Sequence, residues 1–190
     1  MSHHHVIPES SSIMKTCASA LLVAATLIAP AVGAAPAQTM CASSDQPVFS
    51  CPLAGSKKTV SLCAAAGAPH GGGQFYYAYG SDVSKPELRY PGAGDEAKFT
   101  RTHLMFGGNT GGFAYAFTNR GFKYVIYSIS GANNLENQGL VVLKDGETKP
   151  IRQSRCEAGK VSFARERSLI EKTLKWESDP VLEDQGIPTP

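Results

Sequence analysis

The side chains that could support acid–base catalysis are few in this chain. His103 lies in an alternating segment shortly after Asp95 and Glu96, so a histidine–carboxylate pair is the one catalytic arrangement to consider. His70 stands in a glycine-rich stretch, where we expect it to be solvated. A lone strand histidine is usually a packing or surface residue, and the chain has no G-x-S-x-G, H-E-x-x-H or phosphate-loop motif. We therefore predict no catalytic residues and no enzyme activity.

Metal and cofactor sites are not predicted either. Asp82, Glu87, Asp95 and Glu96 could offer carboxylates to calcium, but their spacing does not match the D-x-D-x-D-G pattern of calcium-binding loops. The cysteines lack the paired C-x-x-C spacing of structural zinc sites. We expect these carboxylates to form a solvated edge, and we expect no metal and no cofactor.

Two polar loops make a better case for binding. The segment Ser128–Gly139 joins two strongly apolar strands through amide-rich sequence, whereas a simple hairpin needs only about two to five loop residues. The segment Phe106–Gly112 is similar, and its four glycines serve turn geometry or let a ligand approach the backbone. Recognition loops are often built this way on a rigid sheet; the alternative is a tolerated insertion with no partner. The predicted partner-binding residues are Ser128, Ser130, Gly131, Asn133, Asn134, Glu136 and Asn109.

Tyrosines offer a second candidate surface. Their amphipathic rings could line a face that binds sugar or protein, although core and sheet packing is the expected role for most of them. The tyrosines concerned are Tyr76, Tyr77, Tyr79, Tyr115, Tyr124 and Tyr127.

The elements that must position these residues are short strands. From Val48 to Arg155 the chain alternates apolar runs with turn signals and shows no helical period. The aromatic residues of Phe113–Phe117 alternate with alanines before a turn at Asn119–Gly121, and Asp145-Gly146 marks another hairpin. We predict an all-β fold, an antiparallel barrel or sandwich of about eight or nine strands.

The chain is expected to end in one helix and a tail. A partial apolar stripe predicts a helix over Ser162–Trp176, packed on the strands. The segment 177–190 is acidic and proline-rich, which predicts a flexible tail. The predicted organisation is therefore a leader (1–37), an N-terminal linker (38–47), a β domain with its C-terminal helix (48–176), and the tail.

The N-terminus is typical of a secretory leader. Lys15 precedes the apolar run Ala18–Ala29, and small residues follow, which predicts cleavage near Ala34 or Ala37. The run is short for a membrane span, which needs about 20 apolar residues, so we expect no span in the mature chain. Residues 1–13 are interpreted as an extension upstream of the leader. We expect a periplasmic or secreted protein.

Four cysteines remain after the predicted cleavage. An even number in an oxidising compartment predicts disulfides, with three possible connectivities. Of these we favour Cys41 with Cys51 and Cys63 with Cys156, because the second bond would tie the first sheet to the last strand. The net charge of +2 is too small to indicate a nucleic-acid partner.

Several motifs carry a resemblance to known proteins. Phe49-Ser50-Cys51, Val60-Ser61-Leu62-Cys63, Tyr124–Ser128 and a closing Cys156 resemble small, largely uncharacterised secreted and periplasmic β proteins of proteobacteria, over about residues 48–156. The leader, the disulfides and the Ser130-Gly131 loop also look like periplasmic lysozyme inhibitors and toxin-immunity proteins. In that class a protruding loop blocks a hydrolase cleft, a role the resemblance maps to Ser130-Gly131.

Together these features predict a non-catalytic binding protein outside the cytoplasm. The leading hypothesis is an inhibitor or immunity protein against a cell-wall hydrolase or envelope toxin, with another protein of the envelope or exterior as its partner. The alternative is a glycan- or peptidoglycan-binding module that uses exposed tyrosines.

Overall fold

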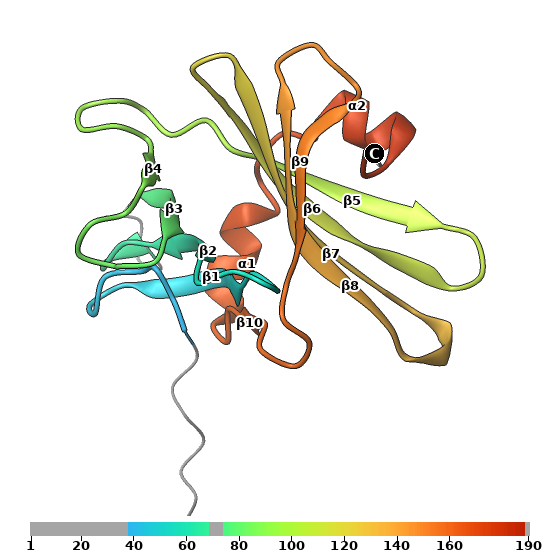
Figure 1. The fold of residues 1–190 in the computed structure, drawn as a ribbon, viewed down its shortest axis with the longest axis horizontal. Coiled ribbons are helices and arrows are strands. Elements are labelled where there is room, and N and C mark those ends of the chain that lie inside the picture. The colour runs from blue at the N-terminus through green and yellow to red at the C-terminus, as the bar shows by residue number, and fades with distance from the viewer. Residues whose placement is uncertain (1–37, 69–73, 189–190) are drawn as a thin grey trace, which may run out of the picture. The chain divides into compact units, whose positions relative to one another are not determined.

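The computed structural model describes residues 38–68 and 74–188, which form two antiparallel sheets of five strands each (Figure 1). The predicted leader (1–37) and His70 lie outside the described residues. The all-β prediction is confirmed, and of the two architectures considered a closed barrel is not formed. The described residues contain ten strands, not eight or nine.

Sheet 1 uses both ends of the described chain, whereas sheet 2 is a simple meander. Sheet 1 has the order β10-β1-β2-β3-β4, and sheet 2 has the order β5-β6-β7-β8-β9. The strands of sheet 1 are β1 (Gln46–Pro52), β2 (Thr59–Ala64), β3 (Phe75–Gly80), β4 (Leu88–Tyr90) and β10 (Ser162–Phe163). The strands of sheet 2 are β5 (Thr100–Phe106), β6 (Thr110–Asn119), β7 (Phe122–Gly131), β8 (Leu135–Lys144) and β9 (Pro150–Arg155).

An aromatic core lies between the sheets. Tyr77 of β3 contacts Phe117 of β6 with ring centroids 4.9 Å apart, and Tyr90 stacks on the same phenylalanine at 4.3 Å. The predicted alternation along β6 explains this packing, because Tyr115 and Phe117 face sheet 1 while Ala114 and Ala116 belong to a separate cluster on the opposite face. We call the face of sheet 2 that points toward sheet 1 its inner face, and the opposite one its outer face.

The two sheets are joined covalently at one corner. Cys156 follows β9 and forms a disulfide with Cys51 of β1. It also forms a β-bridge with Leu53, while its N–H donates to the Gln138 carbonyl of β8 at 2.9 Å. The Cys156 segment thus pairs with β8 on one side and with the end of β1 on the other.

The expected disulfide connectivity is wrong. Cys41 pairs with Cys63, and Cys51 pairs with Cys156. The physical reason is the two-residue period of a strand: Leu62 points into the core between the sheets, so its neighbour Cys63 points to the other face of sheet 1. Cys51 lies in the core, where Cys156 can reach it.

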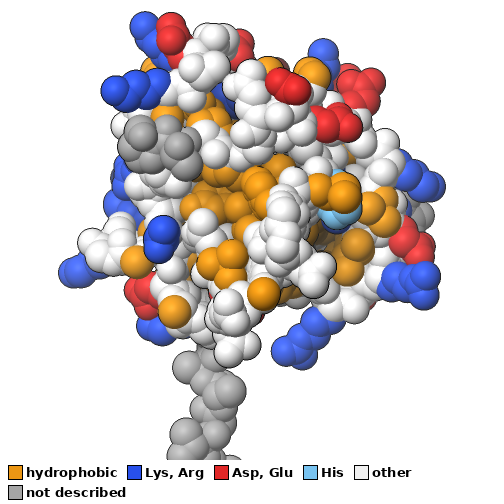
Figure 2. Space-filling view, turned by 90° about the vertical axis from the view of Figure 1, so that its right-hand side faces the viewer, with side chains coloured by type: hydrophobic (Ala, Val, Ile, Leu, Met, Phe, Trp, Pro, Cys, Tyr) orange, Lys and Arg blue, Asp and Glu red, His pale blue; other side chains and the backbone are white. Residues whose placement is uncertain are grey.

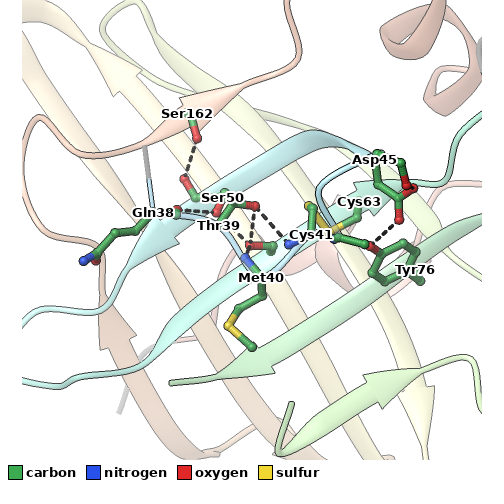
Figure 3. Close-up of a disulfide and its surroundings, with 12 residues drawn as sticks. Gln38, Thr39, Met40, Cys41, Asp45, Ser50, Cys63, Tyr76 and Ser162 are labelled. Atoms are coloured by element: carbon green, nitrogen blue, oxygen red, sulfur yellow. Dashed lines mark hydrogen bonds between the residues drawn. A yellow bond between two sulfur atoms is a disulfide. The ribbon is translucent and has the colours of Figure 1, made fainter. Parts of the chain in front are cut away.

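The predicted N-terminal linker (38–47) lies on sheet 1 and leads into β1, which begins at Gln46. Residues 38–45 form a strap across the face of sheet 1 that points away from sheet 2 (Figure 3). The Met40 N–H donates to Ser61 Oγ at 2.9 Å, and Ser50 Oγ donates to the Gln38 carbonyl at 3.0 Å. Both serines are fully buried, so the strap satisfies hydroxyl groups that the sheet buries.

The C-terminal helix is shorter than predicted. Helix α1 spans Arg167–Thr173, because Phe163 pairs with Phe49 in sheet 1 and holds β10 in an extended conformation. None of the helices in the described part of the chain has the length and apolarity needed to cross a bilayer.

The predicted flexible tail contains a docked helix, α2 (Pro180–Gln185). The Asp179 carboxylate caps it by accepting from the N–H groups of Val181 and Leu182, each at 3.1 Å. Leu182 is buried against the outer face of sheet 2, and Lys123 pairs with Asp179. This capping and burial fix a segment whose proline content had indicated disorder.

The disulfide topology predicts unequal contributions to stability. The Cys51–Cys156 bond closes 105 residues and the Cys41–Cys63 bond closes 22, so the chain-entropy relation gives about 4.7 and about 3.3 kcal/mol. We expect the Cys51→Ala/Cys156→Ala variant to lose more free energy of unfolding in urea than Cys41→Ala/Cys63→Ala. Non-reducing peptide mapping should recover both bonds, and a Cys41–Cys51 peptide would contradict this connectivity.

Asp45, at the end of the strap, should make stability depend on pH. Burial alone raises the pKa of its carboxyl, but hydrogen bonds from Tyr76, Ser44 and the Ala66 N–H outweigh burial, so the pKa lies below its usual value. A lowered folded-state pKa contributes stability above the unfolded value that is lost as pH falls through the folded value. We expect urea unfolding from neutral pH to about pH 3 to show a smaller acid-induced loss in Asp45→Asn than in the unsubstituted protein. Equal losses would contradict the role of this carboxylate.

Candidate functional site

The predicted binding loops lie together at one end of sheet 2. Strands β5 and β6 pair up to Phe106 and Thr110, and β7 and β8 pair up to Gly131 and Leu135. Because Gly111 of β6 pairs with Ser130 of β7, the turns 107–109 and 132–134 are neighbours. We call this region, residues 103–113 and 128–138, the hairpin end.

The expected loop Ser128–Gly139 is therefore mostly strand. Strands β7 and β8 have ten residues each, and the residues between them are the short turn Ala132–Asn134. The segment Phe106–Gly112 is likewise a hairpin with a turn at 107–109. Polar composition indicated loops because the inner face of sheet 2 is exposed at Met105, Ser130 and Glu136, so its strands need no apolar side chains there.

Two rows of side chains cross the inner face of the hairpin end. The row nearer the core contains the paired residues His103, Phe113, Ser128 and Gln138. The row nearer the turns contains Met105, Gly111, Ser130 and Glu136. Four strands about 4.8 Å apart and two rows about 7 Å apart give a flat shelf on the order of 100 Å².

The predicted residues take different positions around this shelf. Ser130 and Glu136 are exposed on it, whereas Ser128 is buried, at 7% exposure. Asn109, Asn133 and Asn134 are exposed in the turns, each with φ of 56° or 57°. Asparagine tolerates this left-handed conformation better than other side chains, so the turns hold three amides at fixed positions in solvent.

Close packing holds the two hairpins together. Gly131 has extended backbone, and a Cβ there would lie 2.5 Å from Thr110 Oγ1. A Cβ on Gly112 would lie 1.9 Å from the Ser128 carbonyl oxygen. Gly131 thus allows the two hairpins to pack closely, and its role in partner binding stays a prediction.

Exposed hydrophobic side chains surround the turns. Met105 is 81% exposed, Leu135 44% and Phe106 40%. Figure 2 views the side toward which these turns project: hydrophobic side chains gather in its middle, beside the single pale-blue histidine, and charged side chains lie at its periphery. Sequence reasoning missed Met105 and Gln138, although alternation from His103 along β5 and from Glu136 along β8 would have placed both on this face.

His103 does not have the surroundings of a catalytic base. It is exposed on β5 and pairs across the sheet with Phe113. None of the ion pairs in residues 38–68 and 74–188 includes His103. Glu96 lines a pocket beside Trp176, and His103 is not among the residues that line that pocket. No group of three or more potential metal ligands occurs in the described residues.

The tyrosines do not form one continuous face. Tyr76, Tyr77, Tyr115 and Tyr127 are buried. Tyr79 and Tyr124 are partly exposed and border one pocket with Arg152, on the same inner face but about 13 Å along β7 from the shelf.

No protein-family model matches the chain, and no curated protein or solved structure matches it either. The resemblance to periplasmic lysozyme inhibitors is therefore still a prediction, and the hairpin end must be assessed from its own geometry.

The close contact at Gly112 predicts a sensitive position in the hairpin end. We expect Gly112→Ala to reduce the free energy of unfolding by about 1–3 kcal/mol, because backbone atoms of β7 must move to admit the methyl group. Gly107→Ala, in the turn of the same hairpin, meets no atom within 4 Å and should change stability little. Equal effects of both substitutions in urea unfolding would contradict this close packing.

Proposed function

We propose that this protein is a non-catalytic binding protein of the periplasm or exterior that inserts its hairpin end into the cleft of another protein. The observation that carries the proposal is the pair of adjoining turns, with three left-handed asparagines and the exposed Met105, projecting from a rigid sheet. The partner class we propose is a cell-wall hydrolase or envelope toxin, as the resemblance to inhibitors and immunity proteins implies.

The size of the shelf supports insertion over flat docking. A stable interface buries about 800 Å² on each partner, far more than a shelf on the order of 100 Å² provides. If the turns enter a cleft, the sides of both hairpins also make contact, including Phe106 and Leu135 on the outer face. Insertion also favours neutral donors and acceptors, because an amide loses less free energy on desolvation than a charged group.

The rigidity of the hairpin end supports tight binding. Backbone pairing continues to both turns, and the glycine contacts at 112 and 131 lock the two hairpins together. A preorganised surface loses little conformational entropy on association, and the left-handed backbone of the turn asparagines is already formed.

The location rests on the two disulfides. Bonds such as Cys41–Cys63 and Cys51–Cys156 fit an oxidising compartment, where they form and persist. The predicted leader, cleaved near Ala34 or Ala37, would deliver the chain there.

The test is inhibition of peptidoglycan hydrolysis. Purified protein is titrated into muramidases, amidases and endopeptidases of the cell envelope, and substrate turbidity is followed. We expect inhibition near stoichiometry for one class, and an inhibitory concentration at least about ten-fold higher for Met105→Ser and for Asn133→Gly/Asn134→Gly, because anchor residues dominate such interfaces. Glycine keeps the left-handed turn, so the second variant removes the amides without straining the backbone.

Arg120→Gly is the matched control. Arg120 is exposed in a left-handed turn (φ 50°) between β6 and β7, at the opposite end of sheet 2. It should inhibit like the unsubstituted protein. Failure to inhibit any hydrolase, together with sedimentation of the protein on peptidoglycan, would replace this proposal with the glycan-binding alternative.

A further inference from the structure

A second candidate site lies between the edges of the two sheets, away from the hairpin end. It is a pocket of about 250 Å³ with mostly apolar walls, formed by β3 and β4 of sheet 1 and by β7, β8 and β9 of sheet 2. Drug-sized ligands occupy pockets of about 300–1,000 Å³, so this one suits a smaller molecule. Its lining includes Tyr77, Tyr79, Tyr124, Leu140, Val142 and Arg152.

A β-bulge shapes the mouth of this pocket. The pairing of β9 with β8 shifts between Val142 and Leu143, so that Ile151 has no partner on β8. As a result the consecutive residues Ile151 and Arg152 both line the pocket, which a regular strand would not allow. Ile151 is 61% exposed there, so it adds apolar surface at the mouth of the pocket.

The Tyr77 hydroxyl is a donor without a partner. Tyr77 is 1% exposed and borders the pocket, and no hydrogen bond from its hydroxyl is found within the described residues. Burial raises the pKa of Tyr77 well above its ordinary value, and nearby Tyr124 and Tyr79 add to the rise while Arg152 opposes it. The hydroxyl therefore remains a protonated donor at physiological pH. Among the described residues Arg101 Nε is the one fully buried side-chain polar atom without a partner, so the Tyr77 hydroxyl is not sealed from the pocket, and a ligand oxygen could take the place of water there.

The charge at the mouth is positive. The Arg152 guanidinium lies 5.7 Å from the centre of the Tyr79 ring and forms no ion pair with any described residue. The one carboxylate in the lining, Glu87, is paired with Lys58. An anionic group entering the pocket would therefore meet an uncompensated cation.

We propose that this pocket binds a small carboxylate with an apolar or aromatic body. Its carboxylate accepts a hydrogen bond from the Tyr77 hydroxyl and pairs with Arg152. Its body packs against Tyr79, Tyr124 and Val142. Ligand binding in this pocket does not depend on the hairpin end, because the two sites share no residue.

Phenylacetate is the probe, and 2-phenylethylamine is the matched ligand with the opposite charge. Amide chemical shifts of the full protein are followed while each is titrated. We expect phenylacetate to shift signals of the pocket residues and to bind at least ten-fold more tightly than the amine. Tyr77→Phe and Arg152→Gln should each weaken phenylacetate binding roughly ten-fold, as the loss of a charge-assisted hydrogen bond does.

The stability of Tyr77→Phe separates binding from folding. Because the hydroxyl has no partner in the unliganded protein, this variant should keep its unfolding midpoint. Tyr127→Phe, a buried tyrosine on the outer face, should leave the affinity unchanged, and Met105→Ser should bind phenylacetate normally while losing hydrolase inhibition. Equal affinity for both probes, full affinity in Tyr77→Phe and Arg152→Gln, or no shifts up to millimolar phenylacetate would each overturn the proposal.

Discussion

The arrangement of the molecule depends on the corner at Cys156. Aromatic packing between the sheets is strong but permits sliding, because rings such as Tyr77, Phe117 and Tyr124 contact one another in several tilts. The corner adds directional bonds: the disulfide to Cys51, the bridge to Leu53 and the hydrogen bond to Gln138. These bonds fix where sheet 1 ends along the strands of sheet 2.

The position at which sheet 1 ends influences which part of sheet 2 is exposed to solvent. Phe113 of β6 still contacts Phe163 of β10, with ring centroids 6.1 Å apart, and Ser128 is 7% exposed, so part of the row that contains them is covered. In the next row toward the turns, Ser130 and Glu136 are exposed. The inner face of β7 thus changes from Tyr124 and Ile126 to Ser128 and Ser130, while its outer face stays apolar through Ile129, because that face has its own cluster, to which α2 contributes Leu182.

The sequence predicts much of this fold, because strand alternation and turn residues are local signals. The β6–β7 hairpin at Asn119–Gly121 and the one at Asp145-Gly146 both form. Applied to β2, the same alternation places Leu62 and Cys63 on opposite faces of sheet 1. This placement favours the observed disulfides. The sequence also contains a usual pattern of helix boundaries at α2. Asp179 is followed by Pro180, and Gly186 stands at the end of the helix.

The remaining features were not predictable, because they depend on contacts between distant segments. Polar residues such as Ser130 and Glu136 look like loop sequence until it is known that their part of the inner face is exposed. The strap is similar: residues 38–45 have little secondary structure, and they are ordered by Ser61, Tyr76 and Cys63, which lie about 20 or more residues away in sequence.

Polar groups in different parts of the protein differ in whether they have a hydrogen-bond partner within it. The Ser50 and Ser61 hydroxyls bond to each other at 2.7 Å and to the strap, so sheet 1 leaves neither without a partner. Arg101 Nε, buried without a hydrogen bond, has its guanidinium 5.3 Å from the centre of the Phe113 ring, which compensates part of its charge. The Tyr77 hydroxyl is not among such fully buried, unpaired atoms, and it borders the pocket. The proposed hairpin-end surface would recognise a partner by shape and exposed amides, whereas the proposed pocket would select an acceptor of matching size. The two proposals therefore concern different classes of molecule.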